Sequence, residues 1–300
     1  RDLRERNDRR IVDLANLQRP YRFHKTYCRL NLDTCLPYEP SQLRERVATA
    51  VVEMRHLMLL QIAQCDLNLI AINLTRRCNL ACEHCYLDAT TLKEGDSDEL
   101  SCGEVKALLD EVHALNSSAM VVLTGGEPLL RPDLEEIICH GSELGLFIVL
   151  GTNGLQLTEK RVAALKNAGL MGAGISLDST EAETHDEFRG LNGAWDKTMK
   201  GIRHCQQLDL SFQIHFTVTQ RNRHEIDDII ALSESLGARV INIFFLICTG
   251  RGETESDLTP AQYESALKDI IQAQENYPDM IVRPRCAPHF KRVALQLNPE

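Results

Sequence analysis

Several features are missing from this 300-residue sequence, and each absence excludes a class of protein. No apolar run approaches the length of a membrane span and the start carries no secretory signal pattern, so we expect no membrane partner. Basic residues are not in excess, since 33 Lys and Arg stand against 43 Asp and Glu, a formal net charge of −10. Binders of nucleic acids and of membrane surfaces need basic fields, so neither role is expected. A local basic pocket for an acidic substrate stays open.

A disulfide framework is not indicated either, because the chain has eleven cysteines, an odd number. A reducing, cytoplasmic location suits these thiols better. The composition is otherwise ordinary for a soluble globular protein, with 43% hydrophobic and 25% charged residues. Three hundred residues can bury the core of one large α/β domain with an appendage. Because the chain begins at Arg1 without a methionine and ends at Glu300, we interpret it as a fragment.

Residues 1–66 do not resolve into a clear domain. Residues 1–10 are a dense charge run, which is typical of a solvated face. Residues 41–64 predict a helix with Ser41 as N-cap and apolar residues at helical spacing. We interpret the three cysteines of this region as unrelated thiols and not as cluster ligands: Cys28, Cys35 and Cys65.

From Leu67 onward the sequence pattern alternates between strands and helices. Six strands are predicted, at residues 67–74, 119–124, 147–151, 171–177, 211–219 and 240–246. Six helices are predicted, at residues 101–115, 133–144, 159–168, 194–208, 224–236 and 260–276. Six βα units in series indicate a parallel sheet with right-handed crossovers. Six units are too few for a closed eight-stranded barrel, so the residues alone predict a parallel α/β fold.

Three cysteines stand close together, at Cys78, Cys82 and Cys85. Cysteine thiolates hold iron–sulfur clusters, and a [4Fe–4S] cube usually takes four of them. Three thiolates would leave one iron with an open coordination position, where a metal centre can do chemistry. A zinc site is the alternative interpretation of such a spacing.

Three further motifs follow in order, each at the end of a predicted strand. They are Thr124-Gly125-Gly126-Glu127-Pro128, Gly151-Thr152-Asn153-Gly154 and Gly174-Ile175-Ser176-Leu177-Asp178. Together with the C-x3-C-x2-C spacing of the cysteines, these motifs resemble those of the radical S-adenosylmethionine (radical SAM) superfamily, over residues 67–250.

The resemblance implies a fold, an open partial (βα)6 TIM barrel of parallel strands formed by residues 67–250. Residues 1–66 are then an N-terminal extension of unknown role. Residues 251–300 would hold the last barrel helix and the start of a truncated C-terminal auxiliary-cluster region. In barrels of parallel strands, ligands bind at the C-terminal ends of the strands, which is where each motif falls.

The resemblance also implies the cofactors. The three cysteines would hold a [4Fe–4S] cluster whose open iron takes the amino and carboxylate groups of S-adenosylmethionine (SAM). An electron from a donor such as flavodoxin or ferredoxin would cleave SAM to a 5′-deoxyadenosyl radical, which abstracts a hydrogen atom from the substrate. The other cofactor-binding residues would be Tyr86 near the adenine, Gly125, Gly126, Glu127 and Pro128 near the methionine, and Thr152, Asn153, Ser176 and Asp178 as polar contacts. For several of these, ordinary packing or a bond to nearby backbone is the alternative.

The strand predicted at residues 211–219 indicates a substrate cavity. Its apolar residues share one face, and Gln213, His215 and Thr217 share the other, which should line the barrel interior. His215 is a weak catalytic candidate, because an interior histidine is more often structural. Arg189 is a candidate for binding a carboxylate of the cofactor or substrate, since its planar fork suits that group. A surface ion pair is the alternative for Arg189.

The remaining cysteines and arginines receive weaker assignments. Arg76 and Arg77 flank the cysteine triplet and are either carboxylate binders or surface residues. Cys286 follows the predicted barrel, and in radical SAM enzymes of the SPASM group a cysteine at this place can begin a second, auxiliary [4Fe–4S] cluster. A free thiol is the alternative for Cys286. Cys139 and Cys205 lie in predicted helices and are expected in the core, and Cys102 has no assigned role.

The substrate is indicated by resemblance alone. Residues 73–80 and 286–290 resemble the tetrapyrrole-modifying branch of the superfamily, which acts in heme d1 and alternative heme biosynthesis. This implies a small-molecule substrate, a tetrapyrrole that bears carboxylates. The alternatives are a SPASM-type peptide maturase, a non-catalytic iron–sulfur protein and, more weakly, a zinc-binding module.

Overall fold

The computed structural model describes residues 67–89, 99–254 and 257–298. They all belong to the second of the two units into which the chain divides, Asp66–Glu300. The helix predicted at residues 41–64 and the thiols of Cys28, Cys35 and Cys65 lie outside the described residues. Within the described ranges, no helix is both long and apolar enough to cross a membrane.

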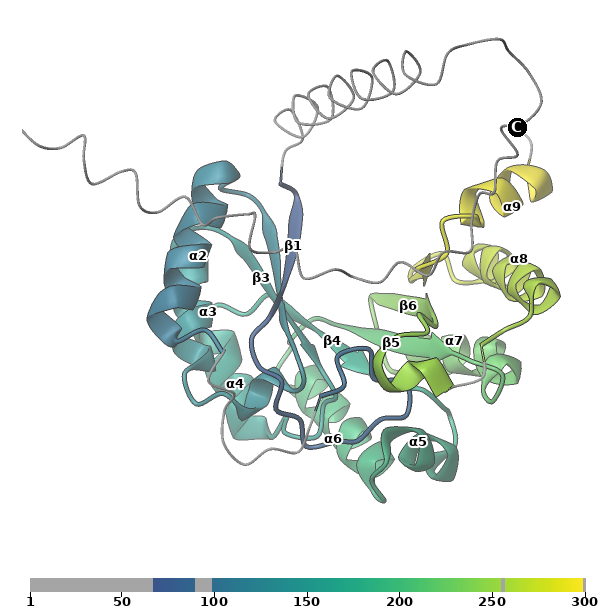
Figure 1. Ribbon diagram of the computed structural model, residues 1–300, viewed down its shortest axis with the longest axis horizontal. Helices are drawn as coiled ribbons and strands as arrows, with labels where there is room; N and C mark the ends of the chain where they lie inside the picture. Colours follow the sequence, from purple (N-terminus) through teal and green to yellow (C-terminus); the bar gives the residue numbers. More distant parts are fainter. Residues whose placement is uncertain (1–66, 90–98, 255–256, 299–300) are drawn as a thin grey trace, which may run out of the picture. The chain divides into compact units, whose positions relative to one another are not determined.

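Seven strands form one parallel sheet, in which each strand pairs with its neighbours in chain order. The strands are β1 (Leu69–Asn73), β2 (Met120–Thr124), β3 (Phe147–Thr152), β4 (Gly172–Ser176), β5 (Phe212–Val218), β6 (Val240–Phe245) and β7 (Ile281–Arg285). The sheet curls into a half-barrel with helices on its outer side (Figure 1). The described residues therefore confirm the parallel α/β fold that the sequence pattern predicted and the partial barrel that the resemblance implied.

Helices connect successive strands and cover the outer face of the sheet. They are α2 (Cys102–Leu115), α3 (Leu134–Glu143), α4 (Glu159–Asn167), α6 (Ala194–Gln207), α7 (Ile226–Ser235) and α8 (Pro260–Asn276). Helix α2 shows why these segments fold as they do. Ser101 and Glu104 form a capping box at its start, and Val105, Leu109 and Val112 recur at helical spacing and are buried. The helix thus turns one apolar stripe toward the sheet.

Strand β5 shows how the two faces of the sheet differ. Its apolar residues at alternate positions are fully buried. The polar residues between them are only half-buried on the inner face: Gln213, His215 and Thr217. This is the alternation that the sequence predicted, because successive side chains of a strand point to opposite faces.

Apart from the short 3-10 helices in the loops, three elements of the described residues were not predicted: α5 (Ala182–Arg189), β7 and α9 (Phe290–Leu297). Helix α5 is short and polar and buries only His185, Phe188 and Arg189, so it has no apolar stripe to reveal it. Strand β7 contains Pro284, which has no N–H for a ladder hydrogen bond and is typical of edge strands. Strand β7 lies at the edge of the sheet, beside β6. The sheet thus has one strand more than the six predicted, and residues 281–285 belong to the half-barrel.

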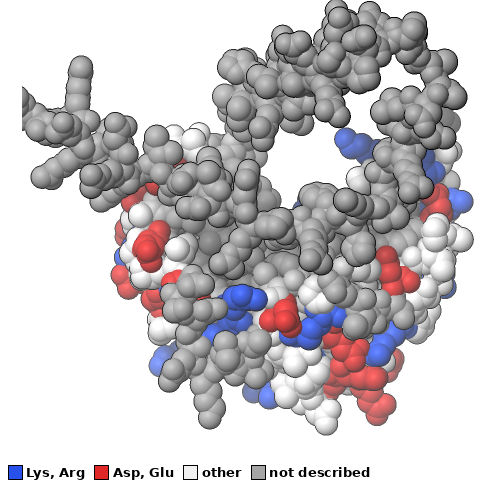
Figure 2. Space-filling view, viewed as in Figure 1, with Lys and Arg blue, Asp and Glu red and all other residues white. Residues whose placement is uncertain are grey.

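Basic and acidic side chains are interspersed over the described surface that Figure 2 shows. Several of these side chains form ion pairs across neighbouring helices, such as Lys106 with Glu136 and Arg161 with Glu135. Exposed pairs of this kind contribute little to stability. The charged residues of the candidate site lie instead inside the half-barrel.

Candidate active site

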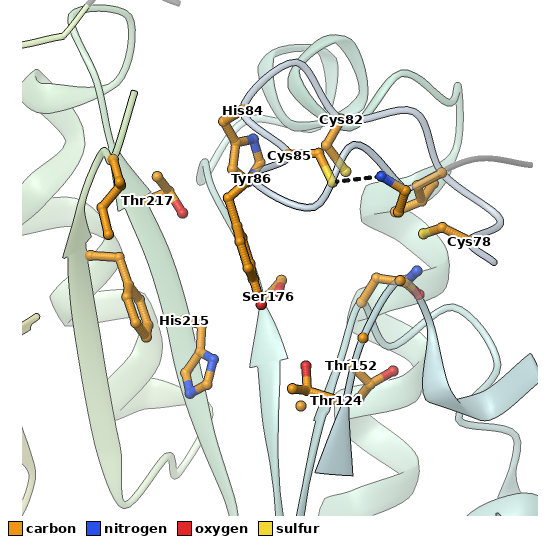
Figure 3. A pocket seen from close by; sticks show the side chains of 18 of the residues that line it. Cys78, Cys82, His84, Cys85, Tyr86, Thr124, Thr152, Ser176, His215 and Thr217 are labelled. Carbon is orange, nitrogen blue, oxygen red and sulfur yellow. Dashed lines mark hydrogen bonds between the residues drawn. The ribbon is translucent and has the colours of Figure 1, made fainter. Parts of the chain in front are cut away.

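The C-terminal ends of the strands meet around a cavity of about 460 Å³. Thr124 of β2, Thr152 of β3 and Ser176 of β4 line one side, and His215 and Thr217 of β5 line another (Figure 3). The segment 78–86, which we call the cysteine loop, lies above these strand ends in Figure 3. The structure therefore brings together the motifs that the sequence placed at separate strand ends.

Gly125 and Gly126 support the start of the cysteine loop. The N–H of Gly126 donates to the carbonyl of Thr75 at 2.7 Å, and the N–H of Glu127 donates to that of Arg77 at 2.8 Å. A Cβ at Gly126 would lie 2.2 Å from the carbonyl oxygen of Arg77. A Cβ at Gly125, where φ is +142°, would lie 2.5 Å from the carbonyl oxygen of Thr75. Both glycines line the cavity, but the close approach that the structure shows is to residues 75–77, which lead into the cysteine loop.

The middle of the cysteine loop is held by α5 and by the short helix η4 (Gly250–Thr254). The carbonyl of Phe188 in α5 accepts a hydrogen bond from Glu83 at 3.2 Å. The ring of Phe188 stacks on the imidazole of His84 with a centroid separation of 4.3 Å. From η4, Nε of Arg251 donates to the carbonyl of Cys82 at 2.8 Å. Two elements that are distant in the sequence therefore contact the middle of the loop.

Cys78, Cys82 and Cys85 present three thiols to the cavity (Figure 3). The first two are buried and the third is half-buried, and no cysteine in the described ranges forms a disulfide. Burial raises the pKa of Cys78 to about 11. Metal ligation requires the thiolate, so metal binding at these residues would release protons.

The spacing of these thiols bears on the kind of metal centre they could hold. Among the residues that the structure describes, no group of three or more His, Cys, Asp or Glu side chains converges closely enough to bind one metal ion. A zinc ion draws its ligand atoms to about 2.0–2.3 Å from a single point. In a [4Fe–4S] cube each thiolate binds a different iron at a different corner, so the thiols stand further apart. Three thiols that face one cavity are the donor set that a [4Fe–4S] cube with one open iron position would use.

Arg189, at the end of α5, is buried beside these thiols. Its Nη1 atom lies 3.7 Å from Sγ of Cys82, and its guanidinium forms an ion pair with Asp178. Burial lowers the pKa of Arg189, but Asp178 and Cys82 raise it, and the net shift is upward. Oδ1 of Asp178 accepts a hydrogen bond from the backbone of Thr217 at 2.8 Å. Since Arg189 is only 7% exposed, it offers little surface to a carboxylate of a bulky substrate.

Glu127 lies behind the cavity wall, with none of its surface exposed. Its carboxylate accepts hydrogen bonds from the hydroxyl of Thr152 at 2.8 Å and from the backbone N–H groups of Asn153 at 2.9 Å and Leu129 at 3.0 Å. Burial raises the pKa of Glu127, and these hydrogen bonds act in the opposite direction. The side chain of Asn153 donates to that of Asn79 at 2.7 Å, which joins the end of β3 to the cysteine loop. Glu127 thus orients two wall residues and is not itself one of them.

His215 lies against Gly174 on the inner face of the sheet. A Cβ at Gly174 would lie 2.3 Å from Cε1 of the imidazole, so the glycine leaves room for the ring. Burial lowers the pKa of His215 to about 4, and the ring is therefore neutral near pH 7. The ring of Phe244 approaches it edge-on, with the centroids 5.2 Å apart. Gln213 does not line the cavity, and its side-chain carbonyl accepts a hydrogen bond from the side chain of Asn242 at 2.7 Å.

The remaining predicted residues divide between the wall and its surroundings. Tyr86 lines the cavity and is 57% exposed. Pro128 begins the short helix η2 (Pro128–Leu130) and is buried, and it is not a wall residue. Arg76 and Arg77 also lie outside the wall.

The other cysteines differ in their surroundings. Cys286 directly follows β7, is exposed and lines the same cavity as the three thiols. Cys205 is fully buried in α6, as predicted. Cys139 was expected in the core, but it is only half-buried, and its Sγ donates to the carboxylate of Glu143 at 3.4 Å. It lies on the flank of α3, beside the apolar stripe and not within it.

Sequence reasoning missed residues whose partners are distant along the chain. Asn79 and Arg251 carried no signal, because each contacts a segment that only the fold brings near. Arg283 and Arg285 carried a weak one, since an i, i+2 spacing places both on one face once β7 is recognised as a strand. Both contact Asn242 of β6.

The structure combines a parallel half-barrel with three thiols at the rim of a cavity that its strand ends form. This combination is typical of a class of enzymes that hold an iron–sulfur cluster beside a small-molecule cosubstrate. The chain belongs to the radical SAM superfamily, whose family model matches residues 72–233. Membership implies a [4Fe–4S] cluster and SAM as cofactors. The superfamily resemblance of the sequence is thus confirmed.

The chain is similar to curated relatives of two different kinds within the superfamily. The chain is 40% identical to the AdoMet-dependent heme synthase of Methanosarcina barkeri over 228 residues, which are 76% of this chain and 64% of that protein. It is 32% identical to the PqqA peptide cyclase of Rhodopseudomonas palustris over 209 residues, 69% of this chain and 55% of that protein. The chain therefore spans less than two thirds of the length of either relative.

Among solved structures, the fold is similar to that of SuiB from Streptococcus suis bound to its precursor peptide SuiA. The TM-score is 0.65 at 15% sequence identity, and the match covers 90% of this chain and 59% of that chain. At this identity the similarity concerns the fold alone.

Proposed function

We propose that this chain is part of an enzyme that modifies a carboxylate-bearing tetrapyrrole by radical SAM chemistry. The observation that supports this most is the 40% identity to an AdoMet-dependent heme synthase over 76% of the chain. The site adds a second support, because three thiols and a row of polar side chains face one cavity.

In this proposal Cys78, Cys82 and Cys85 hold the cluster. When bound, the cluster supplies the electron that cleaves SAM into methionine and a 5′-deoxyadenosyl radical. The guanidinium of Arg189, 3.7 Å from Sγ of Cys82, would offset part of the negative charge of the thiolates. Its ion pair with Asp178 keeps it in that place.

SAM would bind along the ends of β2, β3 and β4. Thr152 and Asn153, both fixed by Glu127, would contact its polar groups together with Ser176. Glu127 acts as a positioning residue in this scheme. Tyr86 would cover the adenine, since it lines the cavity and is largely exposed.

The substrate would enter beside β5 and β6, where the wall changes character. Phe244, Leu246 and Ile247 provide apolar surface there, and His215 and Thr217 provide polar groups. An apolar wall with polar groups beside it suits a flat apolar ring that carries polar arms. A propionate or acetate arm that faced the SAM site would then give a hydrogen atom from a side-chain carbon to the 5′-deoxyadenosyl radical, which becomes 5′-deoxyadenosine. The substrate radical would fragment or be oxidised further, and its remaining electron would pass to an acceptor such as an oxidised iron–sulfur cluster.

The proposal also includes a second cluster and an electron donor. Cys286 would be the first ligand of a second [4Fe–4S] cluster. Flavodoxin or ferredoxin would supply the electron. If the thiol of Cys286 ligates iron, Cys286→Ala should lower the iron content after anaerobic reconstitution, and an unchanged content would reject that role.

The test of the proposed function is anaerobic incubation of the reconstituted protein with SAM, a reductant and either coproheme or siroheme derivatives. Absorption spectra should shift on binding, and the mass of the tetrapyrrole should change as 5′-deoxyadenosine forms. If no tetrapyrrole produces a spectral shift or a mass change, the tetrapyrrole assignment is rejected.

A second candidate is a peptide-modifying enzyme. The observation that favours it is the 32% identity to a PqqA peptide cyclase over 69% of the chain. Stimulation of 5′-deoxyadenosine formation by a precursor peptide, with no response to tetrapyrroles, would favour this candidate.

A further inference from the structure

Two arginines of the edge strand β7 lie on the inner face of the half-barrel. Arg283 pairs in register with Asn242 of β6, and Arg285 pairs with Phe244. Phe244 lines the cavity, and Asn242 pairs in register with His215, a wall residue of β5. Residues in register on neighbouring parallel strands face the same side. Arg283 therefore continues the inner row of His215 and Asn242, and Arg285 continues the inner row of Thr217 and Phe244.

Both arginines are held by the same neutral acceptor. Nε of Arg283 donates to Oδ1 of Asn242 at 3.1 Å, and Nε of Arg285 donates to the same oxygen at 3.0 Å. The amide of Asn242 is itself oriented by Gln213, to which its Nδ2 donates at 2.7 Å. Two guanidinium groups are therefore fixed side by side by a chain of neutral side chains.

No carboxylate in the described part of the chain forms an ion pair with either arginine, and their Nη groups form no hydrogen bond there. Both side chains are half-buried, so they retain access to solvent. Burial lowers the pKa of the Arg283 guanidinium, and the positive charge of Arg285 lowers it further. Two like charges held together without a counter-ion are unfavourable, and an anion placed against both would relieve that cost.

The positive charges of Arg283 and Arg285 also affect His215 in the cavity wall. Burial lowers the pKa of His215 to about 4, and among the neighbouring charges that act in the same direction Arg285 contributes most. The two guanidinium groups are thus close enough to His215 for their field to reach it. Asp178 acts on the pKa of His215 in the opposite direction.

We propose that Arg283 and Arg285 form the binding site for a carboxylate of the substrate, at the open edge of the half-barrel beside His215. This inference rests on the proposed function and adds to it the residues that select a carboxylate-bearing substrate. The planar fork of arginine binds a carboxylate through two parallel hydrogen bonds, so a fixed pair of forks would hold one arm in a defined position.

The test compares coproheme with its tetramethyl ester, in which every carboxylate is capped. Dissociation constants are measured by absorption titration on the cluster-reconstituted protein and on Arg283→Gln, Arg285→Gln and the double variant. We expect the wild type to prefer the free acid. Each single variant should bind the free acid about tenfold to a hundredfold more weakly, as expected for a lost charge-assisted contact, while binding of the ester stays unchanged.

Two controls accompany these variants. Arg203→Gln removes an exposed arginine from α6 and should leave both dissociation constants as they are. Arg283→Lys keeps the charge but loses the fork, and should retain part of the preference for the acid. Iron content and thermal unfolding check that each variant is folded.

The outcomes separate the two proposals. If the wild type binds coproheme and the double variant keeps the full preference for the free acid, the arginine pair is not the carboxylate site, while the proposed function stands. If the wild type binds neither compound, the tetrapyrrole function fails and the assignment of the pair fails with it. Loss of the preference in the variants, with ester binding unchanged, supports both.

Discussion

Truncation of Glu127 should destabilise the protein and weaken SAM binding without touching the cluster ligands. The carboxylate is fully buried and satisfies one hydroxyl and two backbone N–H groups, at 2.8, 2.9 and 3.0 Å. In Glu127→Ala these three donors would lose their acceptor. A buried donor left unpaired costs about 1–3 kcal/mol, but removal of the carboxylate also relieves its own desolvation, and water can enter the space.

We therefore expect the free energy of unfolding to fall by roughly 3 kcal/mol in Glu127→Ala, which for a domain of this size lowers Tm by about 6–12 °C. The affinity for SAM should fall about tenfold, because Thr152 and Asn153 lose the group that orients them. The backbone N–H of residue 127 still donates to Arg77 in the variant, so the cysteine loop should keep its start and the iron content should not change.

The assays are thermal unfolding and equilibrium dialysis with SAM on the reconstituted protein. Glu111→Ala, which removes an exposed glutamate from α2, is the matched control and should change neither quantity. A Glu127→Ala protein with the Tm and the SAM affinity of the wild type would refute the positioning role. A loss of iron in parallel with SAM binding would show that Glu127 supports the cysteine loop instead.

Three further predictions follow from contacts described above. Changing any one of the three thiols of the cysteine loop to alanine should abolish SAM cleavage after anaerobic reconstitution, whereas Cys139→Ala should not, and 5′-deoxyadenosine at the wild-type rate from the triple variant would contradict this. Burial lowers the pKa of His185 to about 4, below its unfolded value, so the unfolded chain binds more protons between pH 6.5 and 4. His185 by itself should therefore contribute about 3 kcal/mol to the fall in the free energy of unfolding as the pH drops through that window. His185→Gln should show a shallower fall in urea titrations, and an identical slope would reject the assignment. Arg189→Gln leaves the buried carboxylate of Asp178 without its partner and should cost about 3–5 kcal/mol in urea unfolding, with the double variant Asp178→Asn, Arg189→Gln costing less than the sum of the two single variants.

The sequence predicted the parts of the fold that are local. Six strands and six helices follow from periodicity and caps, and each lies within a few residues of its predicted bounds. The elements it missed depend on tertiary contacts. Helix α5 has no apolar stripe and is held by what its last residues touch, namely Glu83, His84 and Cys82. Strand β7 is interrupted by a proline that only an edge position tolerates.

The residues of the candidate site also fall into those that local sequence motifs predicted and those whose roles depend on tertiary contacts. The cysteines, the glycines and the polar residues at the strand ends could be named because each motif has a chemical reason for its spacing. The position of Glu127 could not be predicted, since whether a carboxylate lies in a wall or behind it depends on the packing of β3 against η2. The arginine pair of β7 could not be predicted either, because its partner Asn242 is about forty residues away in the chain.

The anchoring of the cysteine loop has a consequence for how the protein matures. Hydrogen bonds and a ring contact from the end of β3, from α5 and from η4 hold residues 78–86. Fixing the backbone of one residue costs about 1–2 kcal/mol, so ordering a segment of this length on metal binding would consume roughly 10 kcal/mol of the binding free energy. In many small zinc domains, by contrast, metal binding and folding are one event. The protein contacts around the cysteine loop should offset part of this ordering cost, so we expect a variant that lacks the three thiols to keep a cooperative thermal unfolding transition.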